Sequence, residues 1–236
     1  MNPAMWRAYE TLKVDVAGVG SLQDWWLPAA PGMPTVVFFH GNGGNKSSFV
    51  ETANRLHRRG WGALLTEYPG FSGAPGKPSE DTIMASARED IAIVAKRGPI
   101  VVWGHSLGSG VAAQMASEGL AQGLVLEAPY TSLSNVAAAR YPYLPMKLIM
   151  LDRFNTRSIL SRIRVPVLIF HSDDDQEIPF AMGEIVGSEL GPRATFVRMH
   201  GVGHFPHRQD LSSIVFQWAD THCFVNCAAR FEADTR

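Results

Sequence analysis

The stretch that most constrains the fold is an apolar run, then a serine between glycines, then a run of small residues. It reads Val101-Val102-Trp103-Gly104-His105-Ser106-Leu107-Gly108-Ser109-Gly110, which predicts a strand, a sharp turn and a helix. Such a turn holds Ser106 in a strained backbone conformation, and Gly104 and Gly108 leave room for it because a Cβ at either position would clash. The hydroxyl then stands at the head of a helix whose free N–H groups favour developing negative charge. We interpret Ser106 as a nucleophile; the alternative is a serine that only caps the helix.

Composition places the chain among ordinary globular α/β proteins. Of its 236 residues, 46% are hydrophobic and 18% are charged, and the formal net charge is −1. These values favour one large domain over residues 1–236 with a buried sheet. The small net charge gives no reason to expect nucleic acid as a partner, and the basic residues of 55–59 are read as the last turn of a helix.

The sequence also predicts the cellular compartment of the protein. No apolar run approaches the roughly 18 residues needed to cross a bilayer, so no transmembrane segment is expected. The stretch 1–13 has no apolar core of a secretory signal. Cys223 and Cys227 match no zinc pattern, and helical i,i+4 spacing holds them too far apart for an easy disulfide. These features predict a reducing, cytoplasmic setting.

Short apolar runs alternate with helical patterns along the chain. Buried strands are expected at 35–39, 61–66, 101–103, 122–127, 165–170 and 195–199, and an antiparallel edge pair at 11–16 and 22–27. Helices are expected at 46–59, from the N-cap Ser79 onward, after Ser106, at 179–190 and at 208–221. This alternation with short loops predicts a mainly parallel eight-stranded sheet flanked by helices.

Polar residues follow three of the expected strands. Ser106 follows one, aspartates 173–175 follow the second, and His200 and His204 follow the third. The carboxyl ends of parallel strands share one edge of a sheet, so these groups are expected to gather there. A serine nucleophile needs a base to take its proton, and the base needs a carboxylate to hold its tautomer. The order serine, acid, histidine therefore predicts a catalytic triad.

No metal and no other cofactor is predicted. Three aspartates in a row at 173–175 could suggest a metal site, but consecutive side chains point in different directions. The glycine-rich stretch 40–45 could suggest a phosphate-binding loop, but it lacks the lysine and the spacing of a P-loop.

The chain resembles the α/β-hydrolase superfamily, in its serine-nucleophile branch. Within it, the chain is most similar to the lid-poor, single-domain hydrolases related to the Bem46-like proteins and the depalmitoylase-like group. The resemblance covers nearly the whole chain. It is carried by His40-Gly41-Asn42-Gly43-Gly44-Asn45, Glu67-Tyr68-Pro69-Gly70-Phe71-Ser72-Gly73, Gly104-His105-Ser106-Leu107-Gly108, Glu127-Ala128-Pro129-Tyr130-Thr131-Ser132-Leu133, His171-Ser172-Asp173-Asp174-Asp175-Gln176-Glu177-Ile178-Pro179 and Gly203-His204-Phe205. It implies an α/β-hydrolase fold with a minimal lid at about 130–163.

The resemblance also assigns the acid and the base. The family's carboxylate lies four residues after the histidine that ends its strand, which selects Asp175, with Asp174 as the fallback. The glycine-histidine turn selects His204 as the base. The resemblance implies structural roles for the histidines at strand ends, which are His40, His105 and His171. The two remaining histidines of this region, His200 and His207, are expected to be ordinary loop or helix-start residues.

Two backbone N–H groups are expected to form the oxyanion hole. One belongs to Leu107, the residue after the nucleophile. The resemblance implies that the other belongs to Asn42, in the loop after the strand at 35–39. Acyl-group transfer needs such donors because negative charge develops on the carbonyl oxygen.

The lid segment supplies candidates for an apolar substrate pocket. They are Tyr130, Tyr141, Tyr143, Leu144 and Met146, and the alternative is that these side chains pack the lid onto the core. Apolar walls without fixed charges predict a small-molecule acyl ester or thioester as the substrate, hydrolysed through an acyl-enzyme. The alternatives are a serine aminopeptidase and a non-catalytic binding protein on the same fold.

Overall fold

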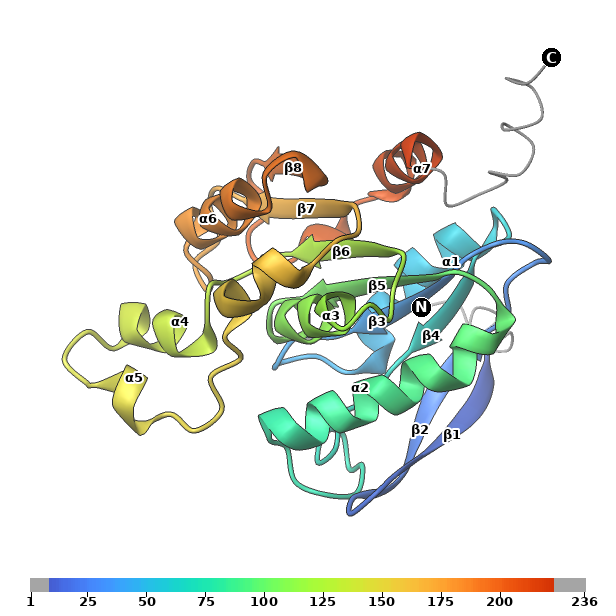
Figure 1. The fold of residues 1–236 in the computed structure, drawn as a ribbon, viewed down its shortest axis with the longest axis horizontal. Helices are drawn as coiled ribbons and strands as arrows, with labels where there is room; N and C mark the ends of the chain where they lie inside the picture. The colour runs from blue at the N-terminus through green and yellow to red at the C-terminus, as the bar shows by residue number, and fades with distance from the viewer. Residues whose placement is uncertain (1–8, 223–236) are drawn as a thin grey trace.

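The computed structural model describes residues 9–222, which form one eight-stranded sheet in the order β1-β2-β4-β3-β5-β6-β7-β8 (Figure 1). The strands are β1 (Glu10–Val16), β2 (Gly20–Leu27), β3 (Thr35–Phe39), β4 (Gly62–Leu65), β5 (Ile100–His105), β6 (Gly123–Glu127), β7 (Val167–Ser172) and β8 (Ala194–Met199). Strands β1 and β2 pair antiparallel, β2 pairs antiparallel with β4, and all other pairs are parallel. The mainly parallel sheet and its antiparallel edge are therefore confirmed.

Helices cover both faces of this sheet. The α-helices are α1 (Val50–His57), α2 (Glu80–Val94), α3 (Leu107–Ser117), α4 (Leu133–Arg140), α5 (Met146–Ile149), α6 (Phe180–Leu190) and α7 (Ser212–Thr221). Short 3₁₀ turns lie at Lys46–Phe49, Ala95–Arg97, Thr156–Arg162, Gly191–Arg193 and Pro206–Arg208. Helices α2, α3 and α6 pack on one face, and α1 and α7 pack on the other.

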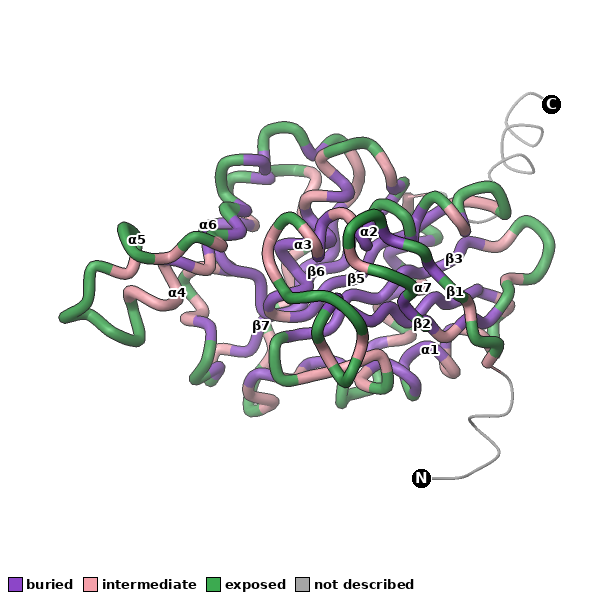
Figure 2. The backbone as a smooth tube through the Cα atoms, turned by 90° about the horizontal axis from the view of Figure 1, so that it is seen from below, coloured by how far each residue is buried: buried purple, intermediate pink, exposed green. Residues whose placement is uncertain are grey.

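The central strands are buried on both sides, so their sequences are apolar without a break. In β3, Val37 and Phe39 pack into the cluster under α2 and α3, whereas Val36 and Phe38 pack into the cluster under α1 and α7. This alternation follows from the two-residue period of a strand. Figure 2 shows the buried strands at the centre of the molecule and exposed backbone around them.

The expected strands are all present, with ends within two residues of the expected ones, and two of the expected helices differ. The helix expected at 46–59 divides into a 3₁₀ turn and α1. The closing helix, expected from 208, begins at Ser212, whose N–H donates to the Asp210 carboxylate at 3.0 Å. Ser79 caps α2 as expected, accepting from the Thr82 N–H at 3.2 Å. Among residues 9–222 no helix has the length and apolarity needed to span a membrane. Cys223 and Cys227 lie outside the described residues.

Two buried carboxyl groups face each other between the sheet edge and α2. Asp24 of β2 and Asp90 of α2 are at most 1% exposed. Burial raises the pKa of Asp24 to about 6. Burial and the neighbouring Asp24 raise the pKa of Asp90 well above its usual range. Asp90 therefore keeps its proton in the folded protein over the pH range in which an exposed aspartate has lost it.

This pair predicts that Asp90→Asn changes how stability depends on pH. An aspartate in the unfolded chain loses its proton near pH 4, whereas folded Asp90 keeps it, so rising pH favours the unfolded state. The amide cannot ionise, so the variant's free energy of unfolding should rise relative to wild type by up to about 1.4 kcal/mol per pH unit above pH 4. Urea unfolding between pH 4 and 8 measures this difference. The exposed neighbour substitution Glu89→Gln is the control, and a pH-independent difference for Asp90→Asn would contradict the raised pKa of Asp90.

Candidate active site

Ser106 occupies the strained turn between β5 and α3. Its backbone angles are φ 52° and ψ −119°, a left-handed conformation that side chains rarely adopt. The Ser106 N–H donates to the carbonyl of Glu127 on β6 at 3.0 Å, and its carbonyl accepts from Ser109 at 2.8 Å. At the start of α3, which lies wholly within the described chain, the Ser106 side chain makes no capping hydrogen bond. The alternative of a serine that only caps the helix is therefore not supported.

The two glycines beside Ser106 allow β3, β5 and α3 to meet at backbone contact. A Cβ built on Gly104 would lie 2.0 Å from the carbonyl oxygen of Gly108. A Cβ built on Gly108 would lie 2.0 Å from the carbonyl oxygen of Phe39. Both distances are far below van der Waals contact, so the expected clash at both positions is borne out.

The structure brings Asp175 and His204 together. The His204 Nδ1 donates to Asp175 Oδ2 at 2.8 Å, and both side chains are buried. The other carboxylate oxygen accepts the N–H groups of Glu177 and Ile178 at 2.8 and 2.9 Å. Burial opposes ionisation of Asp175, but hydrogen bonds from His171, His204 and Ile178 lower its pKa well below the usual range. Asp175 is thus a buried carboxylate that orients the His204 ring.

The neighbouring aspartates and His200 lie at the surface. Asp173 accepts from His200 Nδ1 at 2.6 Å, and the His200 side chain is 73% exposed. Asp174 accepts from the Ser172 hydroxyl and from the Gly203 N–H, the latter at 3.0 Å. Asp174 therefore holds the loop that carries His204 and does not touch the ring.

The loop after β3 turns at Asn42. The Gly44 N–H donates to the carbonyl of Gly41 at 3.0 Å, which closes a turn with Asn42 at its corner. His40 supports this loop, since its Nδ1 donates to the Gly41 carbonyl at 2.8 Å and its Nε2 pairs with Glu67 at 3.1 Å. Leu107 begins α3, so its N–H has no acceptor within the helix.

Ser106, His204 and Asn42 line one hollow of about 410 Å³. The full lining consists of Gly41, Asn42, Gly43, Gly44, Ser48, His105, Ser106, Glu177, His204, Phe205, His207 and Arg208. Two charged residues in it were not anticipated: Glu177, whose Oε2 lies 3.6 Å from His204 Nε2, and Arg208, whose guanidinium stacks over Phe205 at 4.0 Å. The only sequence signal for these two residues was their spacing: Glu177 lies two residues after Asp175, and Arg208 lies four residues after His204.

The expected apolar lining from the lid is wrong. None of the five candidates lines the hollow. Tyr130 is fully buried and donates its hydroxyl to the Leu107 carbonyl at 3.1 Å, so it packs the lid onto the core. Tyr141, Tyr143 and Leu144 are more than half exposed because the segment that carries them projects away from the sheet (Figure 2). The walls around Ser106 are mostly polar and glycine-rich.

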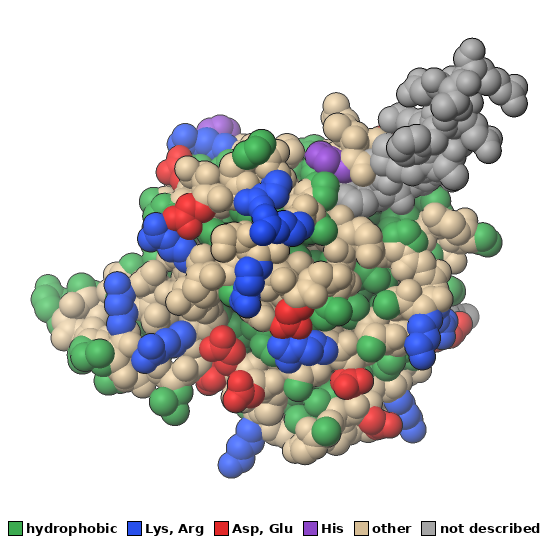
Figure 3. All heavy atoms as spheres, in the orientation of Figure 1, with side chains coloured by type: hydrophobic (Ala, Val, Ile, Leu, Met, Phe, Trp, Pro, Cys, Tyr) green, Lys and Arg blue, Asp and Glu red, His purple; other side chains and the backbone are tan. Residues whose placement is uncertain are grey.

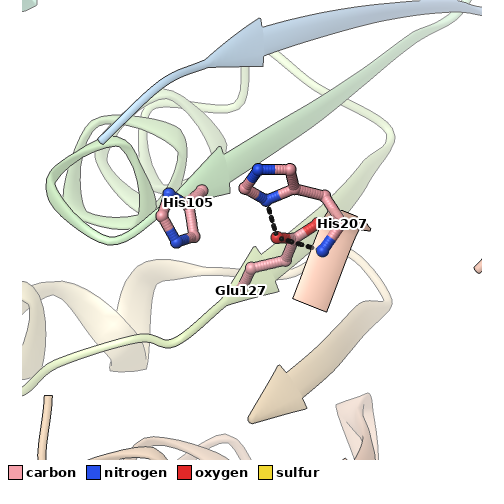
Figure 4. Close-up of side chains that lie close together, drawn as sticks. All are labelled: His105, Glu127 and His207. Atoms are coloured by element: carbon pink, nitrogen blue, oxygen red, sulfur yellow. Dashed lines mark hydrogen bonds and ion pairs between the residues drawn. The ribbon is translucent and has the colours of Figure 1, made fainter. Parts of the chain in front are cut away.

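A second carboxylate–histidine pair, Glu127 and His207, lies beside His105 (Figure 4). Glu127 ends β6, and its carboxylate accepts from Trp103 Nε1, from the His207 N–H and from His207 Nδ1, at 2.7, 3.1 and 2.7 Å. His105 Nε2 donates to the carbonyl of His204 at 2.7 Å. Burial lowers the pKa of His105 well below its usual range, and the nearby His207 and His204 add to this. The structural role expected of His105 is borne out, but His207 is a buried partner of Glu127 and not an ordinary loop residue.

His105, Glu127 and His207 also have the composition of a metal-ligand set. One possible ligand atom of each lies within 4.8 Å of the others. However, both Glu127 oxygens and His105 Nε2 already make protein hydrogen bonds, as described above. Because these atoms are already occupied by hydrogen bonds, we interpret the three residues as a network that supports the His204 loop and not as a metal site.

Comparison with known proteins identifies the family. The family model described as "alpha/beta hydrolase fold" matches residues 34–156, slightly more than half of the chain. The chain belongs to the α/β-hydrolase family. The matched residues contain the Asn42 loop and the Ser106 turn.

Relatives of this α/β hydrolase include proteins with and without an assigned activity. It is 34% identical over 190 residues to an uncharacterized protein of Mycobacterium tuberculosis, covering 78% of this chain and 68% of that protein. It is 29% identical over 216 residues to the lysophosphatidylserine lipase ABHD12 of Rattus norvegicus, covering 81% of this chain and 54% of that protein. The chain thus spans about half the length of that lipase.

The fold is shared with a solved esterase. The structure of the Pyrococcus furiosus esterase Pf2001 matches with a TM-score of 0.77 and 15% identity, covering 94% of each chain. At this identity the match shows the hydrolase fold alone.

The backbone contacts at the Ser106 turn predict that Gly108→Ala destabilises the hydrolase. The added methyl group meets the backbone of β3, which cannot move without disturbing the sheet. The free energy of unfolding should therefore fall by about 3 kcal/mol, the upper end of the usual cost of overpacking. Gly43→Ala is the matched control, because a Cβ there meets nothing within 4 Å and its φ is not left-handed. Thermal and urea unfolding test both variants, and equal midpoints would contradict the steric argument.

Proposed function

We propose that this α/β hydrolase cleaves carboxylic esters through an acyl-enzyme, with Ser106 as nucleophile, His204 as base and Asp175 as acid. The observation that carries the proposal is the buried pair of Asp175 and His204 at 2.8 Å, in which His204 lines the same hollow as the strained Ser106. A histidine held by a carboxylate through Nδ1 presents Nε2 as the acceptor for a serine proton.

The reaction proceeds in two acyl transfers, first from the ester to Ser106 and then from Ser106 to water. The Ser106 oxygen attacks the carbonyl carbon while His204 Nε2 takes its proton, and the alcohol then leaves with that proton. The N–H groups of Asn42 and Leu107 hold the negative oxygen of the tetrahedral intermediate. Water, activated by the same histidine, releases the acid and restores Ser106. Asp175 stays ionised throughout, since its low pKa keeps it a carboxylate facing the imidazolium.

The lining of the hollow supports small acyl groups. Phe205 is its one large apolar side chain, and three glycines and eight polar or charged residues form the rest. Thioesters share the acyl-enzyme route and remain within the proposed class. The rat relative is named a lysophosphatidylserine lipase; from this name we extend the proposal to esters of short acyl groups whose alcohol part is anionic. Arg208, a cation on the wall with no ion pair among residues 9–222, supports that class.

The first test is hydrolysis of p-nitrophenyl esters of graded acyl length by wild type and by Ser106→Ala. We expect turnover that is highest for acetate and butyrate and falls to background in the variant, because the hollow is small and the nucleophile is gone. A fluorophosphonate probe should label wild type and leave Ser106→Ala unlabelled. Neither turnover nor labelling in wild type would overturn the esterase proposal and favour a binding protein. Labelling without turnover would move the substrate toward thioesters or peptides.

The choice of acid is tested by Asp175→Asn beside Asp174→Asn. The amide at 175 cannot hold the imidazolium that forms in each step, so kcat should fall by about 10³-fold or more. Asp174→Asn should retain activity of the wild-type order, because the Asp174 side chain contacts the loop backbone and not the ring. The reverse result, with activity lost only at 174, would make Asp174 the acid.

A further inference from the structure

The segment between β6 and β7 projects from the carboxyl edge of the sheet. Helices α4 and α5 lie against each other and extend away from the rest of the molecule, at the left of Figures 1 and 2. The base of the projection is anchored, because the Leu133 N–H donates to the Arg153 carbonyl at 2.8 Å and Glu80 accepts the Arg153 N–H at 2.9 Å. The projection is thus a fixed part of the fold with a free end.

The free end carries nearly all of the exposed large apolar side chains. Within residues 9–222 there are seven such side chains, and six of them lie in 141–151. They are Tyr141 at 53%, Tyr143 at 96%, Leu144 at 53%, Leu148 at 80%, Ile149 at 57% and Leu151 at 93% exposure. Single exposed apolar residues are common on protein surfaces, but a contiguous group marks an interaction site.

The charges at this end are all positive. Residues 140–151 contain Arg140 and Lys147 and no aspartate or glutamate. Both cations are exposed, and in the described part of the chain neither makes an ion pair. The nearby acid Asp152 is engaged, since it accepts from the Glu80 N–H at 2.8 Å. Figure 3 shows apolar and basic side chains together on the projecting end.

We propose that residues 140–151 form a membrane-docking tip whose partner is the surface of a bilayer containing anionic lipids. The leucine and isoleucine side chains enter the boundary between headgroups and acyl chains, and the tyrosines lie at headgroup level, where amphipathic rings are favoured. Arg140 and Lys147 attract the anionic headgroups. This inference goes beyond the chemistry proposed for Ser106 and does not depend on it.

The shape of the tip favours a bilayer over a second protein. It is a convex end formed by two short helices and the turn between them, with six exposed apolar side chains. A stable protein interface takes about 20 to 30 residues from each partner on matched surfaces. A bilayer adapts to a convex end, and its anionic headgroups complement the two unpaired cations. The tip also leaves the same edge of the sheet that carries Ser106.

The test is flotation of the full chain with vesicles of phosphatidylcholine alone or mixed with phosphatidylserine. Wild type should float with the mixed vesicles, and the bound fraction should fall as salt rises. Leu148→Ser with Leu151→Ser should lower binding more than about tenfold, because both side chains are exposed and contribute their apolar area only to the bilayer. Arg140→Gln with Lys147→Gln should lower binding to the mixed vesicles alone.

Controls separate the docking from the fold and from the reaction. Ile185→Ser, at the seventh exposed apolar side chain, on α6, should bind vesicles as wild type does. The tip variants and Ile185→Ser should unfold at the wild-type temperature and, if the proposed function holds, hydrolyse p-nitrophenyl acetate at the wild-type rate. Ser106→Ala should still float, so loss of esterase activity and loss of docking are read independently.

Three outcomes would overturn the proposal. They are a wild type that floats with neither vesicle, a leucine double variant that floats as well as wild type, and a wild type that dimerises through the tip without binding vesicles. Sedimentation of wild type and the leucine variant over a range of concentrations detects the third.

Discussion

Backbone contact between β5, α3 and β3 is the constraint on which the candidate site depends. The chain reverses from strand to helix within one residue, and Ser106 takes the left-handed conformation that this reversal demands. The strained conformation persists because surrounding hydrogen bonds hold it in place. One of them runs from the Ser106 N–H to the Glu127 carbonyl on the next strand. Any Cβ at Gly104 or Gly108 would separate the three elements. The position of the serine is therefore a property of the sheet and of the helix that follows it.

Glu127 joins the strands to the loop that bears His204. Its carboxylate is fully buried and takes hydrogen bonds from Trp103 on β5 and from His207 beyond β8. His105 holds the carbonyl of His204 from the other side. A buried carboxylate is stable only when its acceptor sites are filled, so this network fixes the loop in one arrangement. The candidate base is thereby supported by three residues outside the predicted triad.

Much of the fold was predictable because its signals are local. The unbroken apolar runs of β3, β5, β6 and β7 indicate strands covered on both faces, and alternation with helices indicates a parallel sheet. The Ser79 cap of α2 is a short-range motif and was predicted correctly. The position of the lid side chains was not predictable in the same way. Apolar residues such as Tyr143 and Leu151 give the same sequence pattern whether they line a pocket, pack in a core or face solvent.

The sequence by itself determined the fold class, the Ser106 turn and the order of the candidate serine, acid and histidine. Each of these rests on neighbours within a few residues, where steric limits and periodicity act directly. Only the tertiary structure decided that Asp175 and not Asp174 meets His204, that His207 pairs with Glu127, and that Asp24 and Asp90 share a buried site. It also decided that the tip at 140–151 is exposed. The physical reason is that burial and side-chain pairing depend on distances between segments remote in sequence, which the packing of the sheet and its loops sets.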